Sequence, residues 1–196
     1  MSRLKLGALP TIILLLLLAM ACGRAGEERG AGPSGAGQNI DARDAFMESV
    51  RALCGKSFEG RGVFSSTEND PMLQQRLVMH VATCTANEIR IPFHVGENRS
   101  RTWILTRSAQ GLLFKHDHRH ADGTPEQLTN YGGWARDAGT PLRQSFPADD
   151  ETATMLPAAA TNVWTMEIVP GRQFVYDLTR HDKPRFRAEF DLTRPL

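Results

Sequence analysis

Apolar and polar residues alternate with a period of two along much of the chain from residue 57 onward, which is the pattern of strands with one buried face. In residues 185–192, for example, Phe186, Ala188 and Phe190 alternate with charged residues. A Pro-Gly pair at 170–171 separates two such segments and indicates a hairpin. The pattern predicts short strands at 57–65, 74–84, 89–95, 102–106, 112–118, 163–169, 173–180 and 185–192.

A different spacing occurs just before these strands. Apolar residues recur at Phe46, Val50 and Leu53, which lie on one face of a helix with 3.6 residues per turn. Asp41 or Asp44 can cap the start of this helix. The sequence therefore predicts one short helix at the N-terminal side of the strands.

The predicted strands follow one another through short connections, without the strand–helix–strand rhythm of a parallel sheet. We expect a mainly β domain, an antiparallel up-and-down sheet that closes into a barrel or bends strongly into a sandwich. This single domain should span residues 40–196. Residues 121–147 interrupt the pattern with a segment rich in Gly, Asp and Pro that carries Tyr131 and Trp134. A long loop in a compact domain is often a lid or a binding loop.

The N-terminus has another character. Arg3 and Lys5 precede an apolar run at 11–20, which overlaps the tetrapeptide Ala-Met-Ala-Cys at 19–22. The run is too short to cross about 30 Å of hydrocarbon, so it predicts a secretory signal. The small residue before Cys22 resembles the lipobox of bacterial lipoproteins, although the tetrapeptide begins with alanine where that family most often has leucine.

The lipoprotein resemblance implies that a signal peptide, residues 1–21, is removed and that Cys22 becomes acylated. The membrane would then be a partner of the protein, held through this lipid anchor. Gly23 replaces the aspartate that marks retention in the inner membrane in that family, which implies the periplasmic face of the outer membrane. Residues 22–39 contain almost no large apolar side chain, so we expect a flexible Gly-rich tether.

Charge and cysteine content narrow the choice of partners. The formal net charge is only +1 and no basic run occurs, which argues against a nucleic-acid partner.

Apart from Cys22, the chain holds Cys54 and Cys84. In an oxidising compartment such a pair predicts a disulfide. A reactive or metal-binding pair is the alternative, but Cys-x-x-Cys spacing is lacking.

The domain resembles the calycins, the class of barrels that includes the lipocalins. The segment Gly-Lys-Ser-Phe at 55–58, preceded by a short helix, is similar to the Gly-x-Trp opening strand of lipocalins. Phe58 stands in place of the tryptophan, and the helix that usually follows a lipocalin barrel is not predicted. Residues 93–133 also resemble an uncharacterised family of exported bacterial proteins, which implies no function.

The densest group of reactive side chains is Lys-His-Asp-His-Arg-His at 115–120. Alternate side chains of a strand share a face, so His116, His118 and His120 should continue the apolar face that ends at Phe114. A His-x-His pair on a strand can bind zinc or copper. A further ligand would come from His94, His120, Asp117 or Asp122.

Two other interpretations of this cluster stay open. In a His-based hydrolase, His116 or His118 would act as the base and Asp117 would orient it, because histidine titrates near neutral pH. The sequence has no Gly-x-Ser-x-Gly motif that would supply a nucleophile. Alternatively, the histidines are solvated side chains at the end of a strand.

Candidate ligand-binding residues share a positive charge or an aromatic ring, and they are Arg99, Arg101, Trp103, Lys115, Arg119, Tyr131 and Trp134. Together these features predict an exported, lipid-anchored β-barrel that binds a small ligand or another component of the cell envelope. A metal-dependent or His-based hydrolase using residues 116–120 is one alternative. A structural envelope lipoprotein without a ligand is the other.

Overall fold

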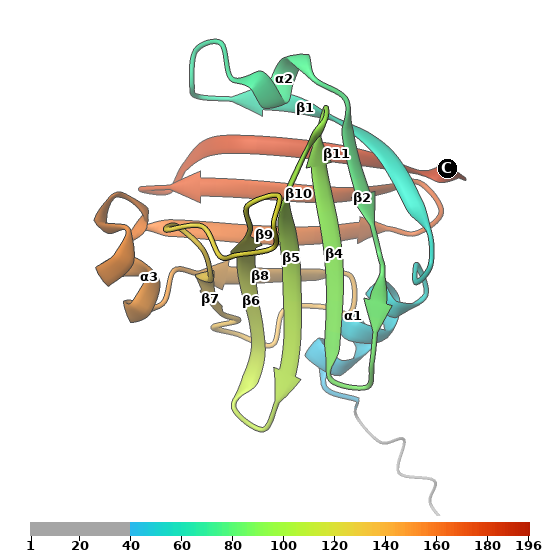
Figure 1. Ribbon diagram of the computed structural model, residues 1–196. Helices are drawn as coiled ribbons and strands as arrows, with labels where there is room; N and C mark the ends of the chain where they lie inside the picture. Colours follow the sequence, from blue (N-terminus) through green and yellow to red (C-terminus); the bar gives the residue numbers. More distant parts are fainter. Residues whose placement is uncertain (1–39) are drawn as a thin grey trace, which may run out of the picture. The chain divides into compact units, whose positions relative to one another are not determined.

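Antiparallel strands make up most of the part of the chain that the computed structural model describes, residues 40–196 (Figure 1). The strands are β1 (Ser57–Ser65), β2 (Leu77–His80), β3 (Thr83–Cys84), β4 (Glu88–Val95), β5 (Asn98–Ser108), β6 (Gly111–His118), β7 (Tyr131–Trp134), β8 (Arg143–Pro147), β9 (Asn162–Val169), β10 (Gln173–Arg180) and β11 (Lys183–Pro195).

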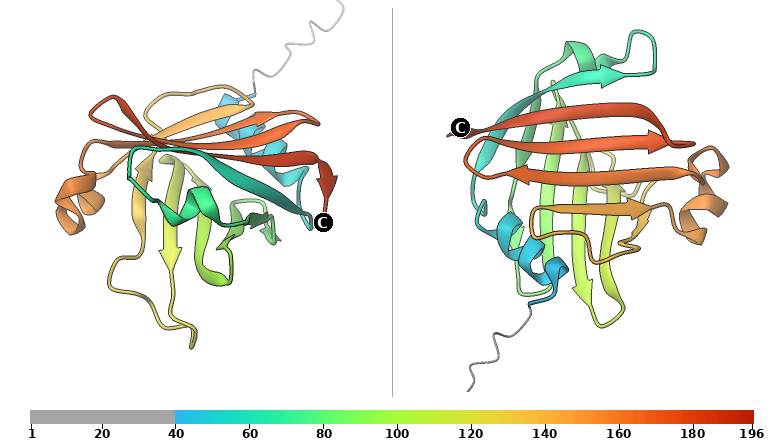
Figure 2. Two further views of the ribbon diagram at one scale, coloured as in Figure 1. Left: turned by 90° about the horizontal axis from the view of Figure 1, so that it is seen from above. Right: turned by 180° about the vertical axis from the view of Figure 1, so that it is seen from behind.

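The strands form a single sheet in which most consecutive strands are neighbours. Its order is β7-β6-β5-β4-β2-β1-β11-β10-β9-β8, with β3 beside β4. Because the first strand pairs with the last, the sheet curls into a nearly closed barrel. Strands β4 to β6 form one wall and run across the direction of β9 to β11 in the opposite wall (Figure 2). The predicted mainly β, antiparallel up-and-down barrel is confirmed.

Three helical segments and one 3-10 turn accompany the sheet: α1 (Ala42–Arg51), α2 (Pro71–Gln74), α3 (Asp150–Met155) and η1 (Pro157–Ala159). The predicted N-terminal helix is α1, and the Asp41 side chain caps it by accepting a hydrogen bond from the Arg43 amide at 2.8 Å. Within the described residues, no helix has the length and apolar character needed to cross a membrane.

Two of the sequence predictions for strands were wrong. The predicted strand 74–84 is split, because Pro71 begins the short helix α2 and the strand pairing resumes only at β2 and β3. The predicted strand 102–106 is too short, because β5 spans Asn98–Ser108 and includes Arg99 and Arg101. The turn before β5 contains Gly96, whose φ of +57° lies in the left-handed region that favours glycine.

The interpretation of residues 121–147 as one long loop also needs correction, because the segment contains β7 and β8. Glycine is depleted in strands, so Gly132 and Gly133 predicted a loop. Here glycine is needed because the chain passes very close to a neighbour: a Cβ atom on Gly133 would lie 1.8 Å from the Pro147 carbonyl oxygen. Tyr131 and Trp134 are therefore strand residues.

The barrel closes between β7 and β8 without a strand ladder in the described chain. The fully buried side chain of Thr152, in α3, bridges the gap. Its hydroxyl donates to the Gly132 carbonyl oxygen at 2.9 Å and accepts from the Gly132 amide at 2.7 Å. The Asp149 amide adds a third hydrogen bond, to the same carbonyl oxygen, at 3.0 Å. We call this contact line the seam.

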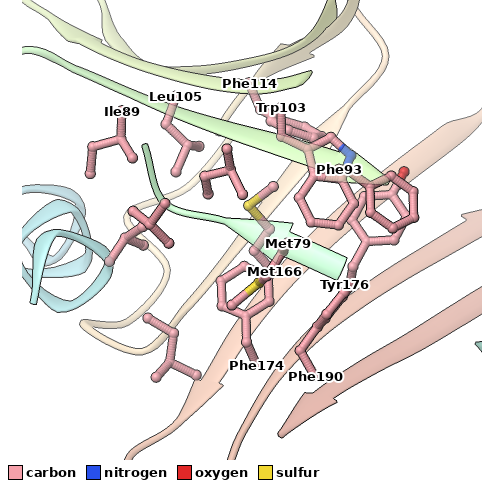
Figure 3. Close-up of a cluster of buried hydrophobic side chains, with 14 of the residues drawn as sticks. Met79, Ile89, Phe93, Trp103, Leu105, Phe114, Met166, Phe174, Tyr176 and Phe190 are labelled. Atoms are coloured by element: carbon pink, nitrogen blue, oxygen red, sulfur yellow. The ribbon is translucent and has the colours of Figure 1, made fainter. Parts of the chain in front are cut away.

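Large apolar side chains fill most of the barrel (Figure 3). Helix α1 lies against the end of the core that holds Ile89 and Leu105, and it buries Phe46 there. The rings of Phe93 and Trp103 lie towards the other end. The two ends of the barrel therefore differ: one is covered by a helix, and the other is walled by aromatic rings.

A disulfide joins Cys54 to Cys84, which confirms that prediction. Cys54 lies in the turn behind α1 and Cys84 in β3, so the bond ties the helix to the sheet. The Arg51 guanidinium adds a hydrogen bond to the Thr85 carbonyl oxygen at 2.8 Å. The predicted signal peptide (1–21), the lipidated Cys22 and the rest of the tether to residue 39 lie outside the described residues.

Candidate functional site

A cavity of about 200 Å³ lies at the aromatic end of the barrel, away from α1. Its aromatic lining consists of Phe93, Trp103, Tyr131, Trp164, Tyr176 and Phe186. Its polar lining consists of Arg101, His116, His118, Asn162 and Arg180. Three aliphatic side chains complete it: Met72 from α2, Leu156 from the segment behind α3, and Leu178 from β10.

Flat ring faces form a rigid base for this cavity. The Trp103 ring stacks on Phe93 and on Tyr176, with ring centroids 4.6 Å apart in both pairs. The His116 ring stacks on Tyr131 at 4.5 Å. Trp103 is only 1% exposed, so its position is fixed by packing on all sides. This stack is therefore a rigid part of the cavity wall, with Trp103 held between Phe93 and Tyr176.

His116 is a buried, neutral imidazole with both nitrogens engaged. Nδ1 lies 3.1 Å from the Tyr131 carbonyl oxygen, which can only accept, so Nδ1 carries the proton. Nε2 then accepts from the Tyr176 hydroxyl at 2.8 Å. Burial lowers the pKa of His116 from 6.5 to about 3, with a smaller contribution from the neighbouring His118. The same burial raises the pKa of Tyr176 well above its ordinary value.

His118 lies nearer the opening and contacts two side chains. Its Nε2 is 3.0 Å from the Tyr131 hydroxyl, and its Nδ1 is 3.6 Å from a Glu126 carboxylate oxygen. Burial is the main cause that lowers the pKa of His118, the positive charge of Arg101 lowers it further, and Glu126 opposes both. Burial raises the pKa of Tyr131 to about 12. These groups are therefore uncharged at neutral pH, apart from Glu126 and Arg101.

Two guanidinium groups face the cavity from opposite walls, Arg101 in β5 and Arg180 in β10. Arg180 Nε donates to the Asn162 side-chain oxygen at 2.8 Å. Arg101 differs, because its buried Nη1 has no hydrogen-bond partner among residues 40–196. Neither arginine is within salt-bridge distance of a carboxylate in the described chain. Arginine keeps its charge at any ordinary pH, so both groups are cationic.

The structure brings some of the sequence-predicted residues to this cavity. Arg101, Trp103, His116, His118 and Tyr131 all line it. They come from three adjacent strands, and the inward-facing positions of β5 and β6 place Arg101 across from His118 and Trp103 across from His116. The candidate cluster at 115–120 therefore contributes His116 and His118 to the interior, as the alternation predicted, whereas His120 was predicted to share this face and lies exposed beyond the end of β6.

Lys115, Asp117 and Arg119 face the other way and contact protein partners. Lys115 Nζ lies 2.9 Å from a carboxylate oxygen of Asp149 and 2.9 Å from one of Glu151, which pins α3 to β6. Arg119 Nε donates to Asp117 at 2.8 Å. Asp117 makes no hydrogen bond with His116 or His118 in the described chain, so the structure does not form the proposed acid–base pair.

The remaining predicted residues lie outside the cavity lining. Arg99 is exposed at the start of β5, and Trp134 is half-buried at the end of β7. His120 is exposed beyond β6, and the ring of His94 is not part of the lining. No group of three or more His, Cys, Asp or Glu residues within 40–196 is placed to hold a metal ion. Protein groups form hydrogen bonds with both ring nitrogens of His116. In the described chain, the three predicted histidine ligands do not form a group that could hold a metal ion.

Sequence reasoning missed several lining residues, among them Asn162, Tyr176, Phe186 and Arg180. The sequence contains a signal for one of them, because Arg180 lies on the same strand face as Tyr176 and Leu178. A charged residue on the inward face at a strand end indicates the opening of a barrel. Met72 and Leu156 come from connections that alternation does not describe.

A larger open groove of about 740 Å³ lies beside β1, β10 and β11. Its rim carries charges of both signs, including Glu59, Arg172, Glu189 and Arg194. None of the sequence-predicted site residues lines it. The aromatic cavity is therefore the better candidate, because it combines apolar walls with two arginine side chains and contains several of the sequence-predicted residues.

Comparisons with models of protein families, with curated proteins and with solved structures find no match to this chain. The resemblance to calycins and to a family of exported bacterial proteins stays a prediction. The function must therefore be argued from the cavity itself.

Proposed function

We propose that this protein is an exported, lipid-anchored barrel that binds a small organic molecule in the aromatic cavity. The observation that carries the binding proposal is the cavity itself, about 200 Å³ enclosed by ring faces at the end of the barrel that α1 does not cover. An engineered apolar cavity of about 150 Å³ is enough to bind benzene. The available volume therefore suits a molecule the size of a substituted six-membered ring.

Three ring probes of matched size test the binding proposal: benzoate, benzyl alcohol and benzylammonium. In ligand-observed NMR titrations of the full chain in detergent, at least one probe should bind with a Kd below about 1 mM. Leu178→Trp fills the cavity with a larger side chain and should weaken that binding at least about tenfold. Leu128→Trp, a change at an exposed position outside the lining, is the matched control. No binding of any probe would refute the proposal.

The proposed anchor rests on the N-terminal sequence, with its lipobox-like tetrapeptide ending at Cys22. The Cys54–Cys84 disulfide supports export, because disulfides form and persist mainly in oxidising compartments. Acyl chains on one residue hold a protein to a membrane only when more than one chain, or a second signal, is present. The proposal therefore requires at least two acyl chains on Cys22.

Expression in a bacterial host with labelled palmitate tests the anchor. We expect the wild-type chain to take up label and to fractionate with the outer membrane. Cys22→Ser should abolish labelling and release the chain into a soluble fraction, while Cys54→Ser/Cys84→Ser should still be labelled. A wild-type chain that is unlabelled and soluble would contradict the anchor and leave the cavity proposal unaffected.

A further inference from the structure

We infer that the ligand of the aromatic cavity is a small organic anion, a carboxylate on a flat apolar body, and that Arg101 binds its charged end. This inference rests on the proposed function and assigns the chemical class of the ligand. It derives from the Arg101 side chain, which lines the cavity, carries a fixed positive charge and is not within salt-bridge distance of any carboxylate of the described chain.

An unsatisfied N–H is costly when it is buried, because it has lost its hydrogen bonds to water. Arg101 Nη1 is in this position, whereas the other cavity arginine, Arg180, donates to Asn162. A carboxylate offers two oxygens in one plane, which matches the fork of a guanidinium group. A carboxylate in the cavity would therefore match both the planar shape and the charge of the Arg101 guanidinium group.

The charges around the cavity favour an anion over a neutral or cationic ligand. Within residues 40–196, the cavity lining contains Arg101 and Arg180 and no acidic residue. Glu126, whose charge influences both His118 and Tyr131, lies against His118 and forms no salt bridge with Arg101. The two lining histidines are neutral at pH 7, because burial lowers both of their pKa values. The net charge of the lining is therefore positive.

The other residues of the cavity lining indicate the shape and polarity of the rest of the ligand. Phe93, Trp103 and Tyr176 stack on one another in the cavity wall, and Phe93 is the strand neighbour of Arg101. Apolar walls exclude water and thereby strengthen a charge-assisted hydrogen bond. A flat anion such as an aromatic carboxylate would contact ring faces at one end and Arg101 at the other.

The same three probes separate this inference from the proposed function, because they differ mainly in charge. At pH 7.5 we expect benzoate to bind about 10- to 100-fold more tightly than benzyl alcohol, and benzylammonium not to bind. Arg101→Gln should weaken benzoate binding by the same factor and leave benzyl alcohol binding within about threefold. Arg99→Gln removes an equal charge from an exposed position of the same strand and should change neither.

Each outcome has a distinct meaning. Equal binding of benzoate and benzyl alcohol, or benzoate binding that survives in Arg101→Gln, would overturn the inference while the binding function stands. No binding of any probe would refute the binding function itself. Thermal unfolding checks the variant: Arg101 is half-buried and forms no ion pair in the described chain, so Arg101→Gln should leave the melting temperature nearly unchanged.

Discussion

Replacing both cysteines of the Cys54–Cys84 disulfide with serine is expected to lower the free energy of unfolding by about 3–4 kcal/mol. The bond closes a loop with a sequence separation of 30 residues, and in the chain-entropy model such a loop restricts the unfolded chain by about that amount. Domains are commonly stable by about 5–15 kcal/mol, so the loss is a large part of the total. Urea unfolding of both proteins measures the difference.

Reduction provides the control for this prediction. Wild-type protein unfolded in the presence of a reductant should lose the same free energy, whereas the Cys54→Ser/Cys84→Ser protein should not respond. The loss should also be uneven within the molecule, because the bond ties the turn behind α1 to β3. Hydrogen exchange in residues 42–51 should increase most. A loss below about 1 kcal/mol would show that packing of Phe46, Met47 and Val50 holds α1 without the bond.

Acidification should destabilise the wild-type protein more steeply than a His116→Gln variant. Burial lowers the pKa of His116 to about 3 in the folded state, whereas an unfolded chain has the ordinary value of 6.5. Between these values the unfolded state binds a proton that the folded state does not, so folded-state stability is complete above pH 6.5 and is lost as the pH falls. The extra slope approaches about 1.4 kcal/mol per pH unit.

A glutamine at position 116 does not titrate, and its amide can both donate and accept towards Tyr131 and Tyr176. The difference in unfolding free energy between wild type and His116→Gln should therefore shrink by about 2–3 kcal/mol between pH 6 and pH 4. His120→Gln, in which an exposed histidine is replaced, is the matched control and should follow the wild-type curve. Parallel curves for wild type and His116→Gln would contradict the buried neutral imidazole.

Alternation along single strands could be read from the sequence because it is a local signal. It gave the barrel class, the inward face of β6 with His116 and His118, and the outward face with Lys115 and Arg119. Alternation failed where a contact between segments far apart in the sequence determines the backbone conformation. Gly133 belongs to a strand because the Pro147 carbonyl leaves no room for a side chain, and that contact joins segments which no local pattern relates.

The candidate site could be predicted only in part for a related reason. Arg101 precedes Trp103 on the inward face of β5, and Arg180 follows Leu178 on the inward face of β10, so each arginine is recognisable as an inward charge at a strand end. Their meeting at one opening depends on the closed ladder between β1 and β11. Whether a guanidinium finds a partner there depends on side-chain geometry: Asn162 reaches Arg180, and no residue of the described chain reaches Arg101 Nη1.

The seam is the place where no strand ladder holds the barrel wall together in the described chain. Separating any other pair of neighbouring strands breaks a ladder of backbone hydrogen bonds. Parting β7 from the segment that follows β8 breaks the three hydrogen bonds at Gly132 and the contacts of Lys115 with Asp149 and Glu151. Partial opening of a native protein follows the route with the lowest free energy. We therefore expect hydrogen exchange to be faster in β7, next to Tyr131, than in the strands that are paired on both sides.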